Sequence, residues 1–362
     1  MIKIALITNN PAPYRIPVFN LIKKFDLTVI YLARRETNRN WSTKNLKHKH
    51  YYLKENFHSH SDGYNFIHNN LDIWKVLNKN NPHIVVTTGY NPSHLYAFIW
   101  SVLKRKRHVC LTDGTISSES HLSFVHKIIR KIFFFRTHAF IGASNKSIEL
   151  FLSYGIPRKE IFRSGLCADN SYFSSCTYTK YDERPFDLIF SGQFHERKLP
   201  FLFTEICKRV NHARGGCRII LIGDGPLREE ILEQLSSLRI EFDYPGFVQQ
   251  ELLPKYYSAA KVLLFTTRLD PWGVVANEAM AAGTPVITTP YAGVAGELVI
   301  DGVTGAVCEP DAEIWTSAAM RLLEDRNHWE LCSANAREIV ASYTYEAAAA
   351  GIEAACEYAL GR

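Results

Sequence analysis

The sequence lacks any long apolar run. No segment of the 362 residues comes near the roughly 18 consecutive apolar residues that a membrane-spanning helix requires. The first apolar segment, Ile2–Thr8, is short, and it leads into Pro11 and Pro13 rather than into a cleavage site. We therefore expect neither a membrane span nor a signal peptide.

Paired cysteines are also missing. The eight cysteines include no C-x-x-C pair and no histidine-rich companion segment, so neither a structural zinc site nor a disulfide framework is expected. They are Cys110, Cys167, Cys176, Cys207, Cys217, Cys308, Cys332 and Cys356. This distribution is typical of a reduced cytoplasmic protein.

Positive charge is scarce in the rear half and abundant in the front half. Residues 1–180 hold 26 Lys+Arg and 10 Asp+Glu, a net charge of +16; the remaining 16 and 26 give −10, and the two sum to +6. Such asymmetry indicates a partner that meets one half only. Nucleic acid is not the partner that we expect, because no recognition module is present and the acidic half would repel a phosphate backbone.

Short apolar segments alternate with helical patterns in both halves, which predicts parallel sheets covered by helices. The expected strands are Ile2–Thr8, Leu27–Ala33, His83–Gly89, His108–Gly114, His138–Ser144, Asp187–Gly192, Arg218–Gly225, Val262–Thr267 and Pro285–Thr289. We expect an α/β protein with a front domain at 1–168, a polar linker at 169–185, a rear domain at 186–342 and an Ala-rich closing helix at 343–362 that can pack back on the front domain.

The segment RLDPWGVVANEAMAAGTPV (Arg268–Val286) places Asp270 just before an expected helix and Glu278 inside it. Eight helical residues span about 12 Å, so the two carboxylates can accept hydrogen bonds from hydroxyl groups on either side of a diphosphate, as in a nucleotide sugar. The alternative is a helix-capping aspartate and an incidental glutamate, and the pair alone leaves both open.

Other residues nearby favour the diphosphate. Gly273 stands at the helix start, where the N–H groups of Val274 and Val275 have no partner within the helix and attract a phosphate. Arg197 and Lys198 follow the first strand of the rear half and can donate to phosphate oxygens. A nicotinamide oxidoreductase is not expected, because the complete G-x-G-x-x-G fingerprint is absent.

Together these segments resemble the retaining glycosyltransferases of the GT-B fold, family four. The E-x7-E motif of that family corresponds to Asp270 and Glu278, with aspartate in place of the first glutamate, and its G-R-x4-K segment to Gly192, Gln193 and Lys198, with glutamine in place of arginine. Four more segments match in order: GDGP (223–226), YPGFV (244–248), EAMAAGTPVI (278–287) and GELVIDGVTG (296–305).

The resemblance implies two Rossmann-like doubly wound domains that face a central cleft. It implies the following donor-side roles: Glu278 on the ribose, Asp270 on the transferred sugar, Val248 on the base, and Gly192, Gly273, Val274, Val275, Lys198 and Arg197 around the diphosphate, with Arg197 replacing the cation that Gln193 lacks. The implied reaction moves a hexose-type sugar, with retention, from a UDP-sugar to a saccharide or lipid-diphosphate-linked acceptor. No metal and no cofactor are expected, because no D-x-D pair is present and cations with oriented amides stabilise the leaving group.

The front domain is expected to bind the acceptor. Tyr14 and Arg15 lie in a proline-rich loop after the first strand and can touch a sugar or a phosphate, unless that loop is merely a rigid turn. The family often carries a histidine near the reacting sugar. Here Asp113, or its neighbour Thr112, occupies that place, and His121 is a candidate substitute, although a lone histidine is more often structural.

Cations alternate with bulky apolar residues in FVHKIIRKIFFFR (Phe124–Arg136), and Lys104–Arg107 lies upstream. This pattern suits a helix lying on an anionic lipid surface; a buried helix with a charged edge is the alternative. We expect a cytoplasmic protein that is peripheral on the inner face of the membrane. Two further functions stay open: a nonhydrolysing UDP-sugar epimerase and a noncatalytic nucleotide-sugar-binding protein.

Overall fold

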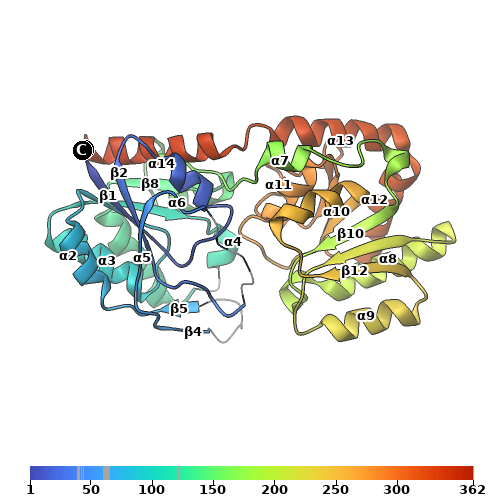
Figure 1. Cartoon of the computed structure of the whole chain (residues 1–362), viewed down its shortest axis with the longest axis horizontal. Helices are drawn as coiled ribbons and strands as arrows, with labels where there is room; N and C mark the ends of the chain where they lie inside the picture. The colour runs from blue at the N-terminus through green and yellow to red at the C-terminus, as the bar shows by residue number, and fades with distance from the viewer. Residues whose placement is uncertain (39–40, 42, 44, 60–65, 121, 362) are drawn as a thin grey trace. The chain divides into compact units, whose positions relative to one another are not determined.

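The computed structural model describes residues 1–362 except 39–40, 42, 44, 60–65, 121 and 362. His121 therefore lies outside the described residues. The chain forms two compact units: Met1–Leu166 together with Tyr345–Arg362, and Cys167–Thr344. Each unit contains a parallel sheet with helices on both of its faces (Figure 1). The predicted α/β class is confirmed.

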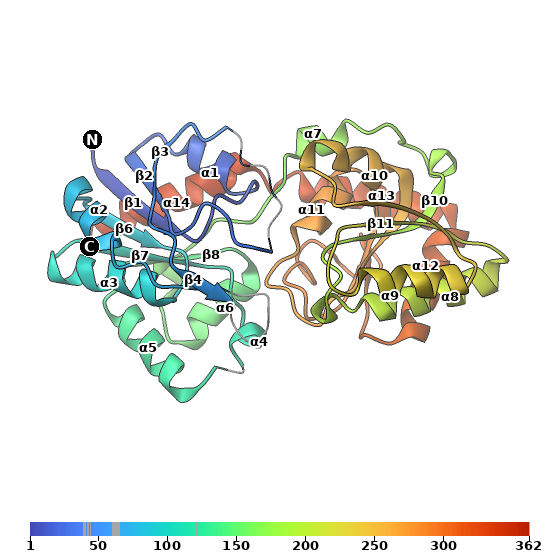
Figure 2. The same ribbon diagram turned by 60° about the horizontal axis from the view of Figure 1, so that its bottom comes forward.

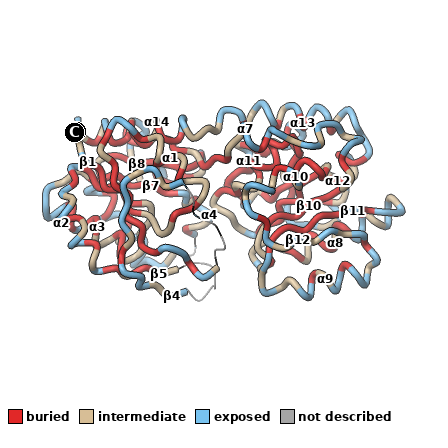
Figure 3. The backbone as a smooth tube through the Cα atoms, in the orientation of Figure 1, coloured by how far each residue is buried: buried red, intermediate tan, exposed pale blue. Residues whose placement is uncertain are grey.

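The first unit is built on a seven-stranded parallel sheet of order β3-β2-β1-β6-β7-β8-β9. The strands are β1 (Lys3–Thr8), β2 (Asp26–Tyr31), β3 (Lys49–Tyr52), β6 (Ile84–Thr87), β7 (Arg107–Thr112), β8 (Ala139–Gly142) and β9 (Ile161–Arg163); β4 (Phe57–Ser59) and β5 (Phe66–His68) form a separate antiparallel pair. The central strands are apolar and buried along their length (Figure 3), because helices shield both faces of the sheet.

Polar side chains cap some of the helices of the first unit. They are α1 (Ile16–Leu21), α2 (Ile73–Asn80), α3 (Pro92–Leu103), α4 (Ile116–Glu119), α5 (Phe124–Phe135), α6 (Asn145–Ser153) and α14 (Tyr345–Leu360). Asn91 caps α3 and Ser144 caps α6, each by accepting a hydrogen bond from a first-turn N–H group. Figure 2 shows α2, α3 and α5 along one side of the unit.

The C-terminal helix α14 packs against the sheet of the first unit. It contacts α1, β7, β8 and β9, and its backbone approaches closely because residue 351 is a glycine. A Cβ atom added to Gly351 would lie 1.7 Å from the carbonyl oxygen of Arg163. Buried Glu353 accepts hydrogen bonds of 3.0 Å from the backbone N–H groups of Lys23 and Lys24. The last residues of the chain thus complete its first unit.

The second unit is built on a six-stranded parallel sheet of order β12-β11-β10-β13-β14-β15. Its strands are β10 (Phe186–Ser191), β11 (Arg218–Ile222), β12 (Glu241–Gly246), β13 (Ala260–Phe265), β14 (Val286–Thr288) and β15 (Gly305–Val307). Its helices are α7 (Asn170–Ser174), α8 (Pro200–Arg214), α9 (Arg228–Ser237), α10 (Leu253–Ala259), α11 (Val274–Ala281), α12 (Ala312–Glu324) and α13 (Arg326–Val340). Helices α8 and α9 cover one face, and α10 and α11 the other (Figure 1).

The segment 169–185, which the sequence predicts as a polar linker, is grouped with the second unit and contains α7 and a 3-10 turn, Tyr181–Glu183. Phe173 is fully buried, and the buried guanidinium of Arg184 donates hydrogen bonds to the carbonyl oxygens of Ala260 at 2.7 Å and Ala282 at 3.0 Å. The sequence does not indicate these contacts. The segment is polar, and the backbone carbonyl oxygens that Arg184 binds follow no sequence periodicity.

The close packing at Gly351 predicts that replacing this helical glycine by alanine lowers the stability of the protein. Gly351→Ala would raise stability by about 1 kcal/mol if helix propensity decided the outcome. Because the added methyl group meets the Arg163 carbonyl, we expect a loss of about 1–3 kcal/mol instead, measured by urea unfolding and by faster hydrogen exchange in α14. Gly216→Ala is the control, because open space surrounds Gly216; a stabilised Gly351→Ala protein would contradict the packing.

Candidate active site

Three loops of the second unit meet where the parallel strands β10, β11 and β12 end. The N–H group of Gly192 donates to the carbonyl oxygen of Ile222 at 2.9 Å, and that of Gly223 donates to Gly246 at 2.9 Å. A Cβ atom on Gly223, whose φ is +131°, would lie 1.8 Å from the carbonyl oxygen of Gly192. Glycine is therefore required for this close approach. Ligands bind at this edge in open α/β sheets.

Helix α11 begins at the same edge. Gly273 stands directly before it with φ +108° and ψ 70°, and a Cβ atom there would lie 2.2 Å from the Phe265 ring. Val274 and Val275 form the first turn of the helix, so their N–H groups have no acceptor within it. The buried Trp272 ring fixes the turn, since its Nε1 donates to Asn277 Oδ1 at 2.8 Å. This helix terminus favours an anion.

Asp270 forms an ion pair beside the start of α11. Its Oδ2 atom lies 2.6 Å from Lys198 Nζ and 3.9 Å from Arg197 Nη1, and its Oδ1 accepts the Trp272 N–H at 3.1 Å. Burial tends to raise the pKa of Asp270, but the charges of Lys198 and Arg197 and these hydrogen bonds outweigh it and lower the pKa below its ordinary value. Asp270 is therefore a fixed anion and a strong hydrogen-bond acceptor.

Lys198 is held in place by its backbone and by an aromatic ring. Its carbonyl oxygen accepts a hydrogen bond from Thr266 Oγ1 at 2.7 Å, and its ammonium lies 4.7 Å from the centroid of the Phe265 ring. The next residue, Leu199, has φ +48° and ψ 50° directly before Pro200. A leucine in this left-handed conformation costs about 1–2 kcal/mol, so the surrounding packing imposes the turn that presents Lys198.

Glu278 lies in α11 as a buried carboxyl group at the end of a hydrogen-bond chain. Tyr257 Oη donates to Glu278 Oε2 at 2.8 Å and lies 2.8 Å from Ser191 Oγ. Burial raises the pKa of Glu278 to about 7, although the Tyr257 hydrogen bond lowers it in part. The two acids thus differ: Asp270 is held ionised by cations, whereas Glu278 titrates near neutrality.

The structure brings the donor-side residues into one unit and reveals others that the sequence did not single out. Gly192 directly follows β10, and Val248 is buried in the loop after β12. Arg197 donates through Nη1 to the Leu269 carbonyl oxygen at 3.0 Å, which ties its loop to that of Asp270. Tyr257 and Ser191 were missed. Tyr257 is identified only by its hydrogen bond to Glu278, which no sequence pattern indicates. Ser191 could have been found from the sequence, because it lies at the end of a predicted strand and is the last residue of β10.

The acceptor-side residues lie in the first unit. Tyr14 packs edge-to-face on Trp41, with ring centroids 6.0 Å apart. Arg15 precedes α1, and its Nη1 atom is buried without a hydrogen-bond partner among the residues that the structure describes. Asp113 is exposed just after β7. Their roles toward the acceptor stay predictions.

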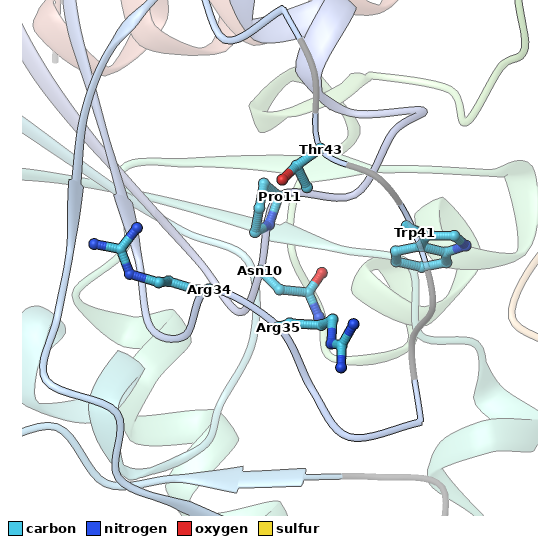
Figure 4. Close-up of a pocket in the computed structure, with 6 residues that line it drawn as sticks. All are labelled: Asn10, Pro11, Arg34, Arg35, Trp41 and Thr43. Atoms are coloured by element: carbon cyan, nitrogen blue, oxygen red, sulfur yellow. The ribbon is translucent and has the colours of Figure 1, made fainter. Parts of the chain in front are cut away.

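A small pocket adjoins the loop of Tyr14 (Figure 4). Its lining residues come from the loops after β1 and β2: Asn10, Pro11, Arg34, Arg35, Trp41 and Thr43. In Figure 4, the side chains of Asn10 and Arg35 lie side by side, and the guanidinium of Arg34 points away from them. The sequence contained a signal for this site, because two adjacent arginines directly follow a buried strand.

The comparisons with known proteins agree with this geometry. Residues 179–339 match the family model for glycosyl transferases group 1. This match lies within the second unit and spans most of it. Among curated relatives, an alpha-D-kanosaminyltransferase of Streptomyces kanamyceticus is 27% identical over 180 residues, covering 49% of this chain and 46% of that protein. A glycogen synthase of Mycobacterium tuberculosis is 25% identical over 186 residues, covering 51% and 44%.

These sequence matches span less than half the length of the two relatives. The fold likeness extends further. HepE of Anabaena, solved as a crystal structure with UDP, matches 99% of this chain and 100% of its own with a TM-score of 0.76 at 16% identity. The chain therefore has the GT-B fold, and the segment that matches group 1 lies in its rear Rossmann-like half. The predicted fold is confirmed, and the group 1 match agrees with the predicted family.

The raised pKa of Glu278 predicts a pH-dependent stability difference. Between the ordinary glutamate pKa of 4.5 and about 7, the unfolded protein loses a proton that the folded protein keeps, so this residue lowers stability progressively as pH rises through that window. Glu278→Gln removes the effect. The variant should therefore gain stability relative to the parent between pH 5 and pH 8, measured by urea unfolding of the ligand-free protein.

The exposed Glu233 on α9 offers the matched control. Glu233→Gln should show no comparable gain. A Glu278→Gln difference that stays constant across this pH range would show that the Glu278 carboxyl group does not titrate near neutrality.

Proposed function

We propose that the protein is a retaining, metal-independent hexosyltransferase that moves a sugar from a UDP-sugar to a saccharide or lipid-diphosphate-linked acceptor. One observation carries the proposal: the Lys198–Asp270 ion pair stands at the amino end of α11, and Glu278 is buried further along that helix. A cation and oriented N–H groups suit a diphosphate, and the two acids suit hydroxyl groups on either side of it.

The donor is proposed to lie along this helix terminus. Lys198 and the N–H groups of Val274 and Val275 contact the diphosphate, and Glu278 accepts hydrogen bonds from the ribose hydroxyls. Glu278 then becomes the ionised acceptor, since two donated hydrogen bonds lower the pKa of a carboxyl group. Val248 lies against the base. The UDP and UDP-glucose complexes of HepE support a nucleotide-sugar donor, and uridine is preferred on that ground.

The chemical step needs charge stabilisation more than a strong base. As the bond between the anomeric carbon and the phosphate oxygen breaks, negative charge grows on the diphosphate, where Lys198 and the α11 amides are already oriented. Retention requires the acceptor hydroxyl to attack from the face that the diphosphate leaves. The departing phosphate oxygen then takes the hydroxyl proton. Asp270, still ionised, holds a hydroxyl group of the transferred sugar.

The proposed function also includes the predictions about metal, cofactor, acceptor site and location. No metal and no cofactor take part, and the acceptor binds in the first unit near Tyr14, Arg15 and Asp113, with Arg35 added from the pocket beside them. The protein acts in polysaccharide or glycoconjugate synthesis on the cytoplasmic side. In the part of the chain that the structure describes, no helix has both the length and the hydropathy to cross a bilayer.

Substitutions of the two cations test the diphosphate site. Lys198→Ala and Arg197→Ala should each lower kcat by about 10²–10³-fold, because each removes a donor to the developing charge, and the fold should be kept. Steady-state transfer assays and circular dichroism measure the two effects. Lys255→Ala is the control, since this exposed lysine lies on α10, outside the two loops that hold the ion pair. Unchanged rates in both site variants would remove the proposed site.

A panel of UDP- and GDP-sugars tests the donor and the reaction class. We expect a thermal shift with one or more UDP-sugars and slow hydrolysis to free sugar of the same anomeric configuration, followed by NMR. Inversion of the anomeric centre would contradict retention. Conversion of one UDP-sugar into its epimer would identify an epimerase instead, and binding without any turnover would identify a noncatalytic nucleotide-sugar-binding protein.

A further inference from the structure

Helix α5 turns an apolar face toward solvent. Five of its large side chains are exposed: Phe124 at 76%, Val125 at 63%, Ile128 at 40%, Ile132 at 60% and Phe135 at 82%. At 100° per residue they fall on one stripe of the helix surface. A soluble protein seldom exposes such a contiguous apolar stripe without a partner. The alternative of a buried helix with only a charged edge is therefore wrong.

The opposite side of α5 is firmly packed, so the exposed stripe is not a consequence of a loose helix. Phe133 stacks on Phe98 of α3 with ring centroids 4.3 Å apart, and Phe134 is buried against Phe140. Arg130 is buried and its Nε atom donates to Glu119 Oε1 at 2.6 Å. These contacts fix the rotation of the helix and hence the direction of the apolar stripe.

Cations border the stripe. Lys127, Lys131 and Arg136 are exposed on or directly after α5. The run Lys104–Arg107 directly follows α3, whose Phe98 stacks on Phe133 of α5. Neither Phe124–Arg136 nor Ile99–Arg107 contains an aspartate or glutamate. The unbalanced positive charge beside the stripe attracts an anionic surface.

Helix α3 extends the apolar area. Ile99, Val102 and Leu103 near its end are exposed, Leu103 at 64%. Figure 2 shows α3 and α5 on the same side of the first unit, and the Phe98–Phe133 stack holds them together. We name the exposed residues of both helices, with the cations that border them, the α3/α5 surface.

We propose that the α3/α5 surface binds an anionic lipid bilayer, with the exposed apolar side chains in the headgroup–acyl boundary and the cations among the phosphates. Charge decides between this occupant and a second copy of the chain, since two copies meeting here would oppose cation to cation with no acid to pair them. Interfacial helices combine these features: an apolar face, bordering Lys and Arg, and no need to span the membrane.

This inference deepens the proposed function, because it places the acceptor domain where a lipid-diphosphate-linked acceptor is found. It does not rest on the donor chemistry. Vesicle binding requires no nucleotide sugar, so a failure of one proposal leaves the other intact.

Sedimentation with vesicles tests the surface. The full chain should bind vesicles made of equal amounts of phosphatidylglycerol and phosphatidylcholine at low salt, dissociate as salt rises, and bind phosphatidylcholine alone weakly. Ile132→Ser/Phe135→Ser should lower the affinity by at least about tenfold, because two apolar side chains that would enter the bilayer are lost. Lys127→Glu/Lys131→Glu should lower it by at least about tenfold through charge.

The matched control is Ile314→Ser/Leu331→Ser, which changes two exposed apolar residues of the second unit, 50% and 57% exposed. Vesicle binding by this variant should equal that of the parent. Circular dichroism and thermal unfolding of the ligand-free protein establish that every variant is folded.

Three results would overturn the proposal. They are no vesicle binding at low salt, equal binding by the parent and both α5 variants, and a concentration-dependent dimer, seen by light scattering, that Ile132→Ser/Phe135→Ser abolishes. The last result would assign the α3/α5 surface to a contact between copies.

Discussion

The ion pair between Lys198 and Asp270 is the constraint on which the site depends. It joins the loop after β10 to the loop before α11, although the two residues are 72 positions apart. The ammonium of Lys198 keeps Asp270 ionised, because burial alone would favour the neutral carboxyl group. A fixed anion and a fixed cation therefore stand where a diphosphate and its sugar would meet.

Unfavourable backbone conformations and close backbone contacts occur near that pair. Leu199 adopts a left-handed conformation before a proline, Gly273 turns into α11 against the Phe265 ring, and Gly223 lies against the Gly192 carbonyl. Strain and close approach of this kind are retained where the surrounding structure determines them. These three positions lie at or directly beside the loops that hold the ion pair.

The candidate sites of the two units rely on different interactions. The second unit gathers buried, partnered charges with defined geometry. The first unit instead presents unbalanced cations and exposed apolar side chains on α3 and α5, together with the pocket of Asn10 and Arg35. A site built for a small phosphorylated ligand needs orientation, whereas a surface that meets a bilayer needs only charge and apolar area.

The sequence by itself determined the alternation of strands and helices, the helix that begins at Val274, and the residues of the donor motifs, because apolar periodicity and glycine spacing are local properties. Tertiary structure alone decided which partners these residues have. The Tyr257–Glu278 hydrogen bond, the hydrogen bond from Arg184 to the carbonyl oxygen of Ala282 just after α11, and the hydrogen bonds from Lys23 and Lys24 to Glu353 of α14 link residues distant in the chain. No local pattern encodes such contacts; they arise only when packing brings the elements together.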